Sequence, residues 1–186
     1  VKSVGGKKHP VLGTALVGQA LPDGYTLLLT TSVFICNPSL YKNAGYDPFK
    51  EFAPIILAGV SATVVSRHPS YTAVNSMQDI LQQSKIAPIP FASPGIGTAG
   101  HLSGELFRNI TKANIQAVPY KGAGPAMTAL LGGEVRLGFT AVPPVVALAR
   151  GGKLVPIAVT SIKRLDVLPN VPTVAESYPG FEVDNM

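Results

Sequence analysis

The sequence predicts an α/β fold in which strands and helices alternate along the chain. Apolar β-like runs alternate with segments of helical periodicity, and glycine or proline turns separate them. Only 13% of the residues are charged, while 19 Gly and 17 Pro indicate a compact fold of many short elements. Because helical segments separate the strands, the sheet is expected to be rich in parallel pairs.

The first elements are expected to be extended. Residues 25–32 (YTLLLTTS) follow a Pro-Asp-Gly turn and predict a strand. Residues 53–67 predict a longer apolar extended segment. A helix is expected next, because Ser76 and Asp79 form a capping-box pattern ahead of an apolar pair.

Two glycine loops are each predicted to join a strand to a helix. The strand IPFAS leads through Gly95 and Gly97 to an amphipathic helix from Thr98, whose apolar side chains are Leu102, Leu106 and Ile110. The strand IQAVPY leads through KGAGP to a short apolar helix with Pro125 at its first position.

The remaining elements continue the alternation. VRLGFTAV predicts a strand, Pro143 and Pro144 start the next helix, and LVPIAVTS predicts the last strong strand. Thr173 and Glu176 form a capping box for a brief helix. In α/β sheets ligands bind at the carboxyl ends of strands, which is where both glycine loops are predicted to lie.

Composition narrows the classes of partner. The net charge of +5 favours an anionic partner, but the basic residues do not cluster and no basic/aromatic stripe exists, which argues against nucleic acid. The sequence contains no run of about 18 apolar residues, so it predicts no membrane-spanning helix. The single Cys36 cannot form an internal disulfide and has no companion for a metal site.

Residues 95–100 match the dinucleotide pattern G-x-G-x-x-G, but the surrounding sequence argues against a nucleotide. No acidic residue lies between Ala113 and Gly133, where the ribose contact is required, and Pro94 interrupts the tight turn. Two interpretations of the loop stay open. Glycines and unpaired amides at a helix start, capped by Thr98, can bind a carboxylate or phosphate, or can form a plain helix cap.

Neighbouring polar residues carry similar pairs of interpretations. His101 lies one turn into the helix. It either contacts the ligand directly, or lies at the surface or behind the residues that do. Tyr120, Lys121 and Gly122 offer a phenol, a cation and flexible backbone at the next strand end, or a merely solvated lysine. Residues 30–32 (Thr-Thr-Ser) either donate hydroxyl hydrogen bonds to a ligand or are the polar residues typical of an edge strand. No arrangement of catalytic residues is supported.

Four stretches of the sequence, in the order in which they occur, resemble those of a known family. They are PDGYTLLLTTS, FASPGIGTAGHLSGELF, VPYKGAGPAMTALLGGEV and GGKLVPIAVTSIKRLDVLPNVPTVAESYPGFE. Together they resemble the Bug-type extracytoplasmic solute receptors of tripartite tricarboxylate transporters, over essentially the whole chain from about residue 11. The resemblance implies a two-lobed periplasmic-binding-protein fold, of type II-like α/β architecture, that closes around a small organic acid. It implies no enzyme activity, no cofactor and no metal.

The resemblance also implies how the chain is divided. Residues 67–161 are expected to form a nearly complete second lobe, and residues 1–66 and 162–186 part of the first. Family members are longer at both ends, so the chain is expected to be truncated there. A periplasmic location, and delivery of a mono- or dicarboxylate to membrane transporter subunits, are implied with it.

Thr140 is a departure, because family members commonly carry Asp at this position. A neutral side chain argues against an amino-acid ligand and favours a simple carboxylate. An enzyme or a non-binding structural module on the same scaffold are the alternative functions. The residues predicted to bind the ligand are Thr31, Ser32, Ser93, Gly95, Gly97, Thr98, His101, Tyr120, Lys121, Gly122 and Thr140.

Overall fold

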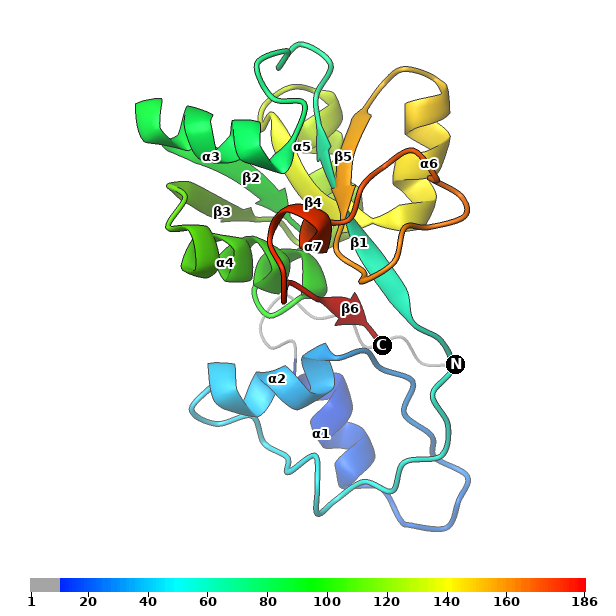
Figure 1. Cartoon of the computed structure of the whole chain (residues 1–186). Coiled ribbons are helices and arrows are strands. Elements are labelled where there is room, and N and C mark those ends of the chain that lie inside the picture. Colours follow the sequence, from blue (N-terminus) through cyan, green and yellow to red (C-terminus); the bar gives the residue numbers. More distant parts are fainter. Residues whose placement is uncertain (1–10) are drawn as a thin grey trace. The chain divides into compact units, whose positions relative to one another are not determined.

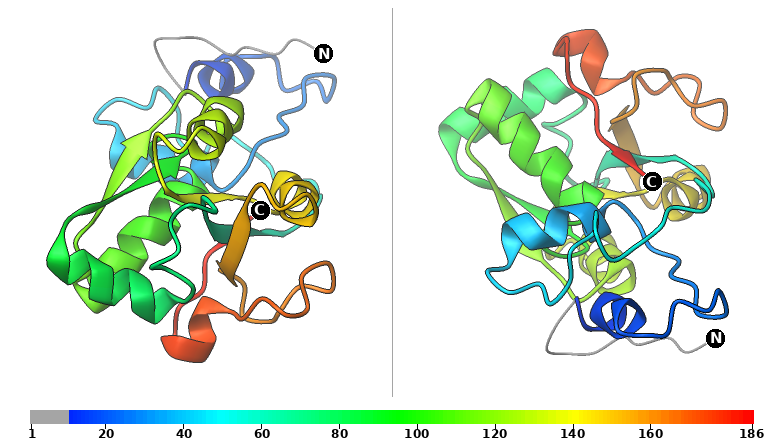
Figure 2. Two further views of the ribbon diagram at one scale, coloured as in Figure 1. Left: turned by 90° about the horizontal axis from the view of Figure 1, so that it is seen from above. Right: turned by 90° about the horizontal axis from the view of Figure 1, so that it is seen from below.

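The protein forms two compact units, according to a computed structural model that describes residues 11–186. The first unit extends to Ala58 and also takes in Met186, and the second runs from Gly59 to Asn185. Figure 1 labels the helices and strands, and Figure 2 adds two views at right angles.

The described part of the first unit is small and helical. It contains α1 (Leu12–Gly18) and α2 (Val33–Leu40), joined and followed by irregular chain. Phe34 stacks on Tyr46 at 5.4 Å between ring centroids, and Phe52 packs edge-on against both rings. The Tyr46 hydroxyl donates to the Phe34 carbonyl oxygen at 2.7 Å, so the segment after α2 is tied back to that helix.

The strand predicted over residues 25–32 is wrong. Residues 25–31 belong to neither a helix nor a strand, and Ser32 is the N-cap of α2. A strand needs a hydrogen-bonded neighbour. The described residues of the first unit hold no strand that pairs with this segment, so its β propensity is not realised.

The second unit is built on one six-stranded sheet of order β3-β2-β4-β1-β5, with β6 paired to β1. Its strands are β1 (Ser61–Arg67), β2 (Ile89–Ser93), β3 (Ile115–Pro119), β4 (Leu137–Ala141), β5 (Val155–Val159) and β6 (Asp184–Asn185). β2 runs parallel to β3 and β4, whereas β1 runs antiparallel to β4, β5 and β6. The α/β class is confirmed, but the sheet is mixed.

Helices cover both faces of this sheet (Figure 1). They are α3 (Met77–Ile86), α4 (Ala99–Thr111), α5 (Ala123–Leu131), α6 (Val142–Arg150) and α7 (Val174–Ser177). Val65 of β1 packs in the core cluster with side chains of α3, α4 and α7, and the adjacent Val64 packs with α5 and α6. Both valines are fully buried, as expected for a strand at the centre of a three-layer fold.

The observed helix starts lie at the predicted residues or within two residues of them, because helix starts depend on local sequence and local hydrogen bonds. The Ser76 hydroxyl accepts from the amide of Asp79, and Thr173 and Glu176 form a complete capping box. α5 begins at Ala123, two residues before Pro125, and α6 begins one residue before Pro143.

The predicted apolar face of α4 is wrong. Leu102 and Leu106 are only partly buried and Ile110 is 45% exposed, whereas Ser103, Gly104 and Phe107 are buried. The reason is close packing. A Cβ atom at Gly104 would overlap the Phe91 ring, with its Cε2 atom only 2.6 Å away.

The family division into lobes at residues 66/67 and 161/162 stays a prediction. Within the second unit, the segment after β5 packs on the same core as the sheet, since Val174 and Phe181 are buried there. A bridge between Val159 and Thr173 adds to this attachment.

Candidate anion-binding edge of the sheet

Four strands of the second unit end at one edge of the sheet. β2 is parallel to β3 and β4, and β4 and β5 are both antiparallel to β1, so these four strands point the same way. The chain passes from β2 into α4, from β3 into α5 and from β4 into α6. Three helix N-termini therefore start from this edge, where unpaired amides and helix dipoles favour negative charge.

The first glycine loop, residues 93–98, is held by its own hydroxyl groups. The buried Ser93 hydroxyl accepts from the amide of Gly95 at 3.3 Å and lies 3.2 Å from the Gly95 carbonyl oxygen. Thr98 caps α4, donating to the same carbonyl oxygen at 2.7 Å and accepting from the amide of His101 at 3.3 Å. Gly95 and Gly97 have φ of 147° and 82°, conformations that favour glycine.

The first turn of α4 presents amides to this edge. Within residues 11–186, no hydrogen bond links the amides of Ala99 and Gly100 to any acceptor. A Cβ atom at Gly100 would overlap the Phe139 carbonyl oxygen of β4 and lie 3.0 Å from Pro94 Cδ. The start of α4 is thus packed tightly against the end of β4, and both Ala99 and Gly100 are buried.

His101 supports the glycine loop. Its Nδ1 accepts from the amide of Gly97 at 3.4 Å, which in the neutral ring leaves the proton on Nε2. The half-buried ring also lines a shallow hollow with Ile96 and Pro119.

The second glycine loop is joined to the first by backbone hydrogen bonds. The amide of Tyr120 donates to Ser93, and that of Gly122 donates to Pro94, both at 2.9 Å. Gly122 has φ of 109° and caps α5, and the Lys121 side chain is exposed. The two loops therefore form one continuous backbone surface.

The Tyr120 phenol already has a partner. Its hydroxyl lies 3.1 Å from Oε1 of Glu134. Burial first, and then the hydrogen bond and the charge of Glu134, raise the pKa of Tyr120. The phenol is neutral at physiological pH and donates to that carboxylate.

Thr140 lies at the end of β4 with an unsatisfied hydroxyl. The residue is 1% exposed, and its Oγ1 has no hydrogen-bond partner within the described chain. A buried hydroxyl without a partner is unfavourable, and a ligand atom is one way to satisfy it.

Thr31 and Ser32 belong to the first unit. The Thr31 carbonyl oxygen accepts from the amide of Phe34 at 2.8 Å, and the residue is exposed. Ser32 is the N-cap of α2. Their predicted role opposite the glycine loops stays a prediction.

Sequence reasoning missed two features of this edge. Thr160, after β5, accepts from the amide of Thr63 at 2.9 Å and donates to the Val183 carbonyl oxygen at 2.7 Å, which locks β1 and β5 to the C-terminal segment. The second feature is charge. Residues 93–101, 119–124, 140–145 and 159–164 contain no acidic residue, which the sequence itself reveals once these segments are known to share an edge.

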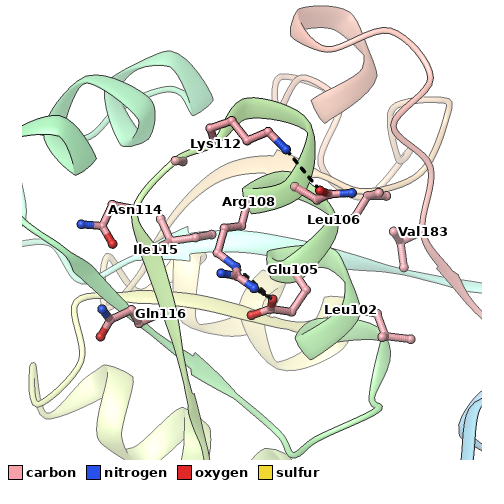
Figure 3. A pocket seen from close by; sticks show the side chains of 11 residues that line it. Leu102, Glu105, Leu106, Arg108, Lys112, Asn114, Ile115, Gln116 and Val183 are labelled. Carbon is pink, nitrogen blue, oxygen red and sulfur yellow. Dashed lines mark hydrogen bonds and ion pairs between the residues drawn. The ribbon is translucent and has the colours of Figure 1, made fainter. Parts of the chain in front are cut away.

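A larger groove of about 970 Å³ lies between α4 and β3 (Figure 3), and it shares Glu105 and Arg108 with the hollow beside His101. Leu102, Leu106 and Val183 line it, and Glu105 accepts from Arg108 Nε at 3.0 Å inside it. This ion pair leaves Lys112, which donates to Asn109 Oδ1 at 3.4 Å, as the remaining charged side chain of the groove. None of the residues predicted to bind the ligand lines it.

Residues 11–186 hold neither a cluster of metal ligands nor a membrane-spanning helix. No group of three or more His, Cys, Asp or Glu side chains lies together in a way that would hold a metal ion. No helix there is both long and apolar enough to span a membrane.

The chain matches the family model "Tripartite tricarboxylate transporter family receptor" over residues 3–185. It is 35% identical to protein BugT of Bordetella pertussis over 176 residues, which are 92% of this chain and 54% of BugT. The chain thus spans about half the length of this relative.

Solved structures agree with this match. The periplasmic binding protein BugD is 38% identical with a TM-score of 0.84, over 94% of this chain and 59% of that one. The R. palustris protein Rpa4515, solved with adipate, is 33% identical with a TM-score of 0.86, over 94% and 60%. The fold is therefore part of the two-lobed periplasmic-binding-protein architecture, and the names of the matched family and of BugD are those of a receptor and a binding protein, not of an enzyme. Because the family model covers nearly the whole sequence, the chain belongs to the receptor family of the tripartite tricarboxylate transporters.

Proposed function

We propose that the chain is part of a periplasmic receptor that binds a small dicarboxylate at the edge where α4, α5 and α6 begin. The observation that carries this proposal is the pair of unpaired amides at Ala99 and Gly100. They lie at a helix N-terminus, which attracts anions through its dipole as well as its donors.

The electrostatics of the edge favour the same ligand class. Its loops hold no acidic residue, while Lys121 and Lys163 are exposed cations within them. A carboxylate entering this edge meets no like charge in these loops and gains charge-assisted hydrogen bonds.

The ligand of a relative supports the same ligand class. Rpa4515 was solved with adipate, a dicarboxylate. In this chain one carboxylate would accept from the amides of α4, and Thr140 Oγ1 would supply a further hydrogen bond. Ser93, Thr98 and His101 act by holding the loop, since their polar atoms already bond within it.

Closure of two lobes around the ligand, with Thr31 and Ser32 on the other side, is part of the proposal. Contacts made only in the closed state would bias such a hinge motion. The receptor would then deliver the acid to the membrane subunits of a tripartite transporter.

A proline substitution tests the amides directly. Ala99 is the first helical residue and follows Thr98, whose φ of −70° and ψ of 158° suit a residue before proline. Ala99→Pro therefore removes one N–H while keeping the helix start, and Ala99→Gly keeps the N–H as the control.

Isothermal titration with adipate is expected to show binding by the unmodified chain and by Ala99→Gly. The affinity of Ala99→Pro should fall by about 1.5–3 kcal/mol, the contribution of a hydrogen bond to a charged group. Hexane-1,6-diol, which has the same carbon chain without carboxylates, should not bind. Equal affinity of the proline and glycine variants, or binding of the diol, would remove the basis of the proposal.

A further inference from the structure

The end of the sheet opposite the glycine loops carries a cluster of basic residues. β1 ends there at Arg67, which is paired with Leu137 of β4 on one side and with Val155 of β5 on the other. Arg136 directly precedes Leu137, and Lys153 lies two residues before Val155. Because neighbouring strands lie about 4.8 Å apart, Arg136 and Lys153 flank Arg67 on its two sides.

A fourth cation, Arg150, lies in the same place. It is the last residue of α6, and the turn from α6 into β5 is closed by a 2.9 Å hydrogen bond from the amide of Lys153 to the Leu148 carbonyl oxygen. The end of β1 and the start of β5 lie together in Figure 1. Arg67, Arg136, Arg150 and Lys153 are called the basic end of the sheet below.

Arg67 is buried without an acidic partner. It is 8% exposed, and its guanidinium donates to the carbonyl oxygens of His68 and Pro69 and to Asn75 Oδ1. Its buried Nε has no partner within the described residues. Buried charges in proteins are ordinarily paired with an opposite charge. The positive charge of Arg67 is therefore not neutralised by the side chains that hold it.

The other three cations of the basic end are exposed. Within residues 11–186, none of Arg136, Arg150 and Lys153 forms an ion pair. Arg136 lies over the Tyr71 ring, 5.8 Å from its centroid, a contact that leaves the charge of the guanidinium in place. These three side chains can therefore meet an external anion.

Acidic residues and helix dipoles do not balance these cations. Residues 67–76, 132–136 and 150–154 contain one acidic residue, Glu134, whose carboxylate already accepts from the Tyr120 phenol. The C-termini of α5 and α6 each add about half a negative charge at this end. Since Glu134 and the two helix ends together offset about two of the four cations, an excess of about two positive charges is left.

The arrangement of the basic end indicates the kind of anion that it fits. Its cations come from separate strand and helix ends, and none of them lines the groove between α4 and β3 or the hollow beside His101. Cations spread in this way suit a surface that carries many anions. We propose that the basic end docks on a membrane surface of anionic lipids, where its arginine and lysine side chains contact headgroup phosphates.

This inference rests on the proposed periplasmic location, which places a membrane surface within reach, and not on the carboxylate site. Its test contains no carboxylic acid ligand. Failure of the membrane contact and failure of adipate binding are therefore distinguishable.

Flotation of lipid vesicles with the 186-residue chain tests the proposal. The chain is expected to float with vesicles that contain phosphatidylglycerol and not with vesicles of phosphatidylcholine alone. Arg136→Gln with Lys153→Gln should weaken binding by about 10- to 30-fold, because two cations that face the anionic surface are lost. Circular dichroism of each variant verifies that it is folded.

Lys121→Gln with Lys163→Gln is the matched control. Both lysines are exposed, and the change removes the same charge at the opposite edge of the sheet. Vesicle binding by this variant should stay within about twofold, because charges more than a Debye length from the lipid surface are screened.

Four results would overturn the proposal. They are no flotation with phosphatidylglycerol vesicles, equal flotation with phosphatidylcholine vesicles, equal loss of binding in the two double variants, and capture of the chain by poly-glutamate without binding to vesicles. The last result would assign the basic end to an acidic protein.

Discussion

Single residues at the sheet edge decide how closely the helices approach the strands. Gly104 lies in α4 against Phe91, whose ring also packs on Phe139 at 4.9 Å between centroids. Gly124, in the first turn of α5, has no atom within 4 Å of the position its Cβ would take. The same substitution should therefore have opposite effects at the two positions.

Gly104→Ala is expected to lower the free energy of unfolding by about 1–3 kcal/mol, because the added methyl group overpacks the core. Gly124→Ala should raise it by up to about 1 kcal/mol, the difference in helix propensity. Urea unfolding of both variants checks this, and stabilisation by Gly104→Ala would contradict the packing described for α4.

Thr140 and Thr160 form a second informative pair, since both are buried but only one is satisfied. Thr160 Oγ1 makes two hydrogen bonds, whereas Thr140 Oγ1 makes none within the described residues. Thr160→Val should destabilise the fold by about 1–3 kcal/mol. Thr140→Val should be neutral or stabilising by about 1 kcal/mol without ligand, and should weaken adipate binding.

Thermal unfolding and calorimetric titration of these two variants distinguish a hydroxyl that stabilises the fold from one that binds the ligand. Destabilisation by Thr140→Val in the absence of ligand would mean that its hydroxyl has a structural partner. Unchanged adipate affinity would mean that the hydroxyl does not face the ligand.

At the scale of elements, local signals were predictable from sequence and non-local ones were not. The caps at Thr98 and Thr173 were predicted because each depends on residues only three positions apart. The buried face of α4 was not predictable, because Gly104 is buried by the close approach of α4 to Phe91 of β2. Hydrophobic periodicity does not encode this approach. The direction of β1 was missed for the same reason, since flanking helices look alike around parallel and antiparallel strands.

In the candidate site, too, the local features were predictable from sequence and the non-local ones were not. Both glycine loops were located correctly at the ends of β2 and β3, because turn chemistry marks them. The commitment of the Tyr120 phenol to Glu134 was not predictable, because it depends on where a later loop returns.

The short helix α7 gives the fold a pH dependence. Glu176 forms an ion pair with Arg164, whose Nε lies 2.7 Å from Oε1, and it also accepts from the amide of Thr173. These hydrogen bonds, led by that of Arg164, lower the pKa of Glu176 from its ordinary 4.5 to about 2. The folded state therefore holds the carboxylate charged at pH values where the unfolded chain protonates it.

The stabilisation from Glu176 should be complete above pH 4.5 and lost as the pH falls toward 2. Urea midpoints measured across this interval should fall less steeply for Glu176→Gln than for the unmodified chain. Glu182→Gln is the control, because Glu182 is exposed and makes no ion pair in the described residues. Identical slopes for the unmodified chain and Glu176→Gln would contradict the role given to this pair.

At the scale of the whole molecule, a single sheet brings separate loops of the second unit, none of which contains an acidic residue, to one edge. The sequence predicts the loops one by one, and parallel strand direction places their helix starts together. Membership of the receptor family follows from a match that covers residues 3–185. The central claim is that this edge binds a dicarboxylate.

The most direct measurement is an NMR titration of backbone amides with adipate, and with hexane-1,6-diol as the control. We predict saturable shifts at Ala99 and Gly100, with smaller ones at residues 120–124 and 140–142, and none with the diol. Binding by part of a cleft is expected in the millimolar range. Shifts that gather instead at the groove between α4 and β3, or no shift with adipate up to about 100 mM, would contradict the account.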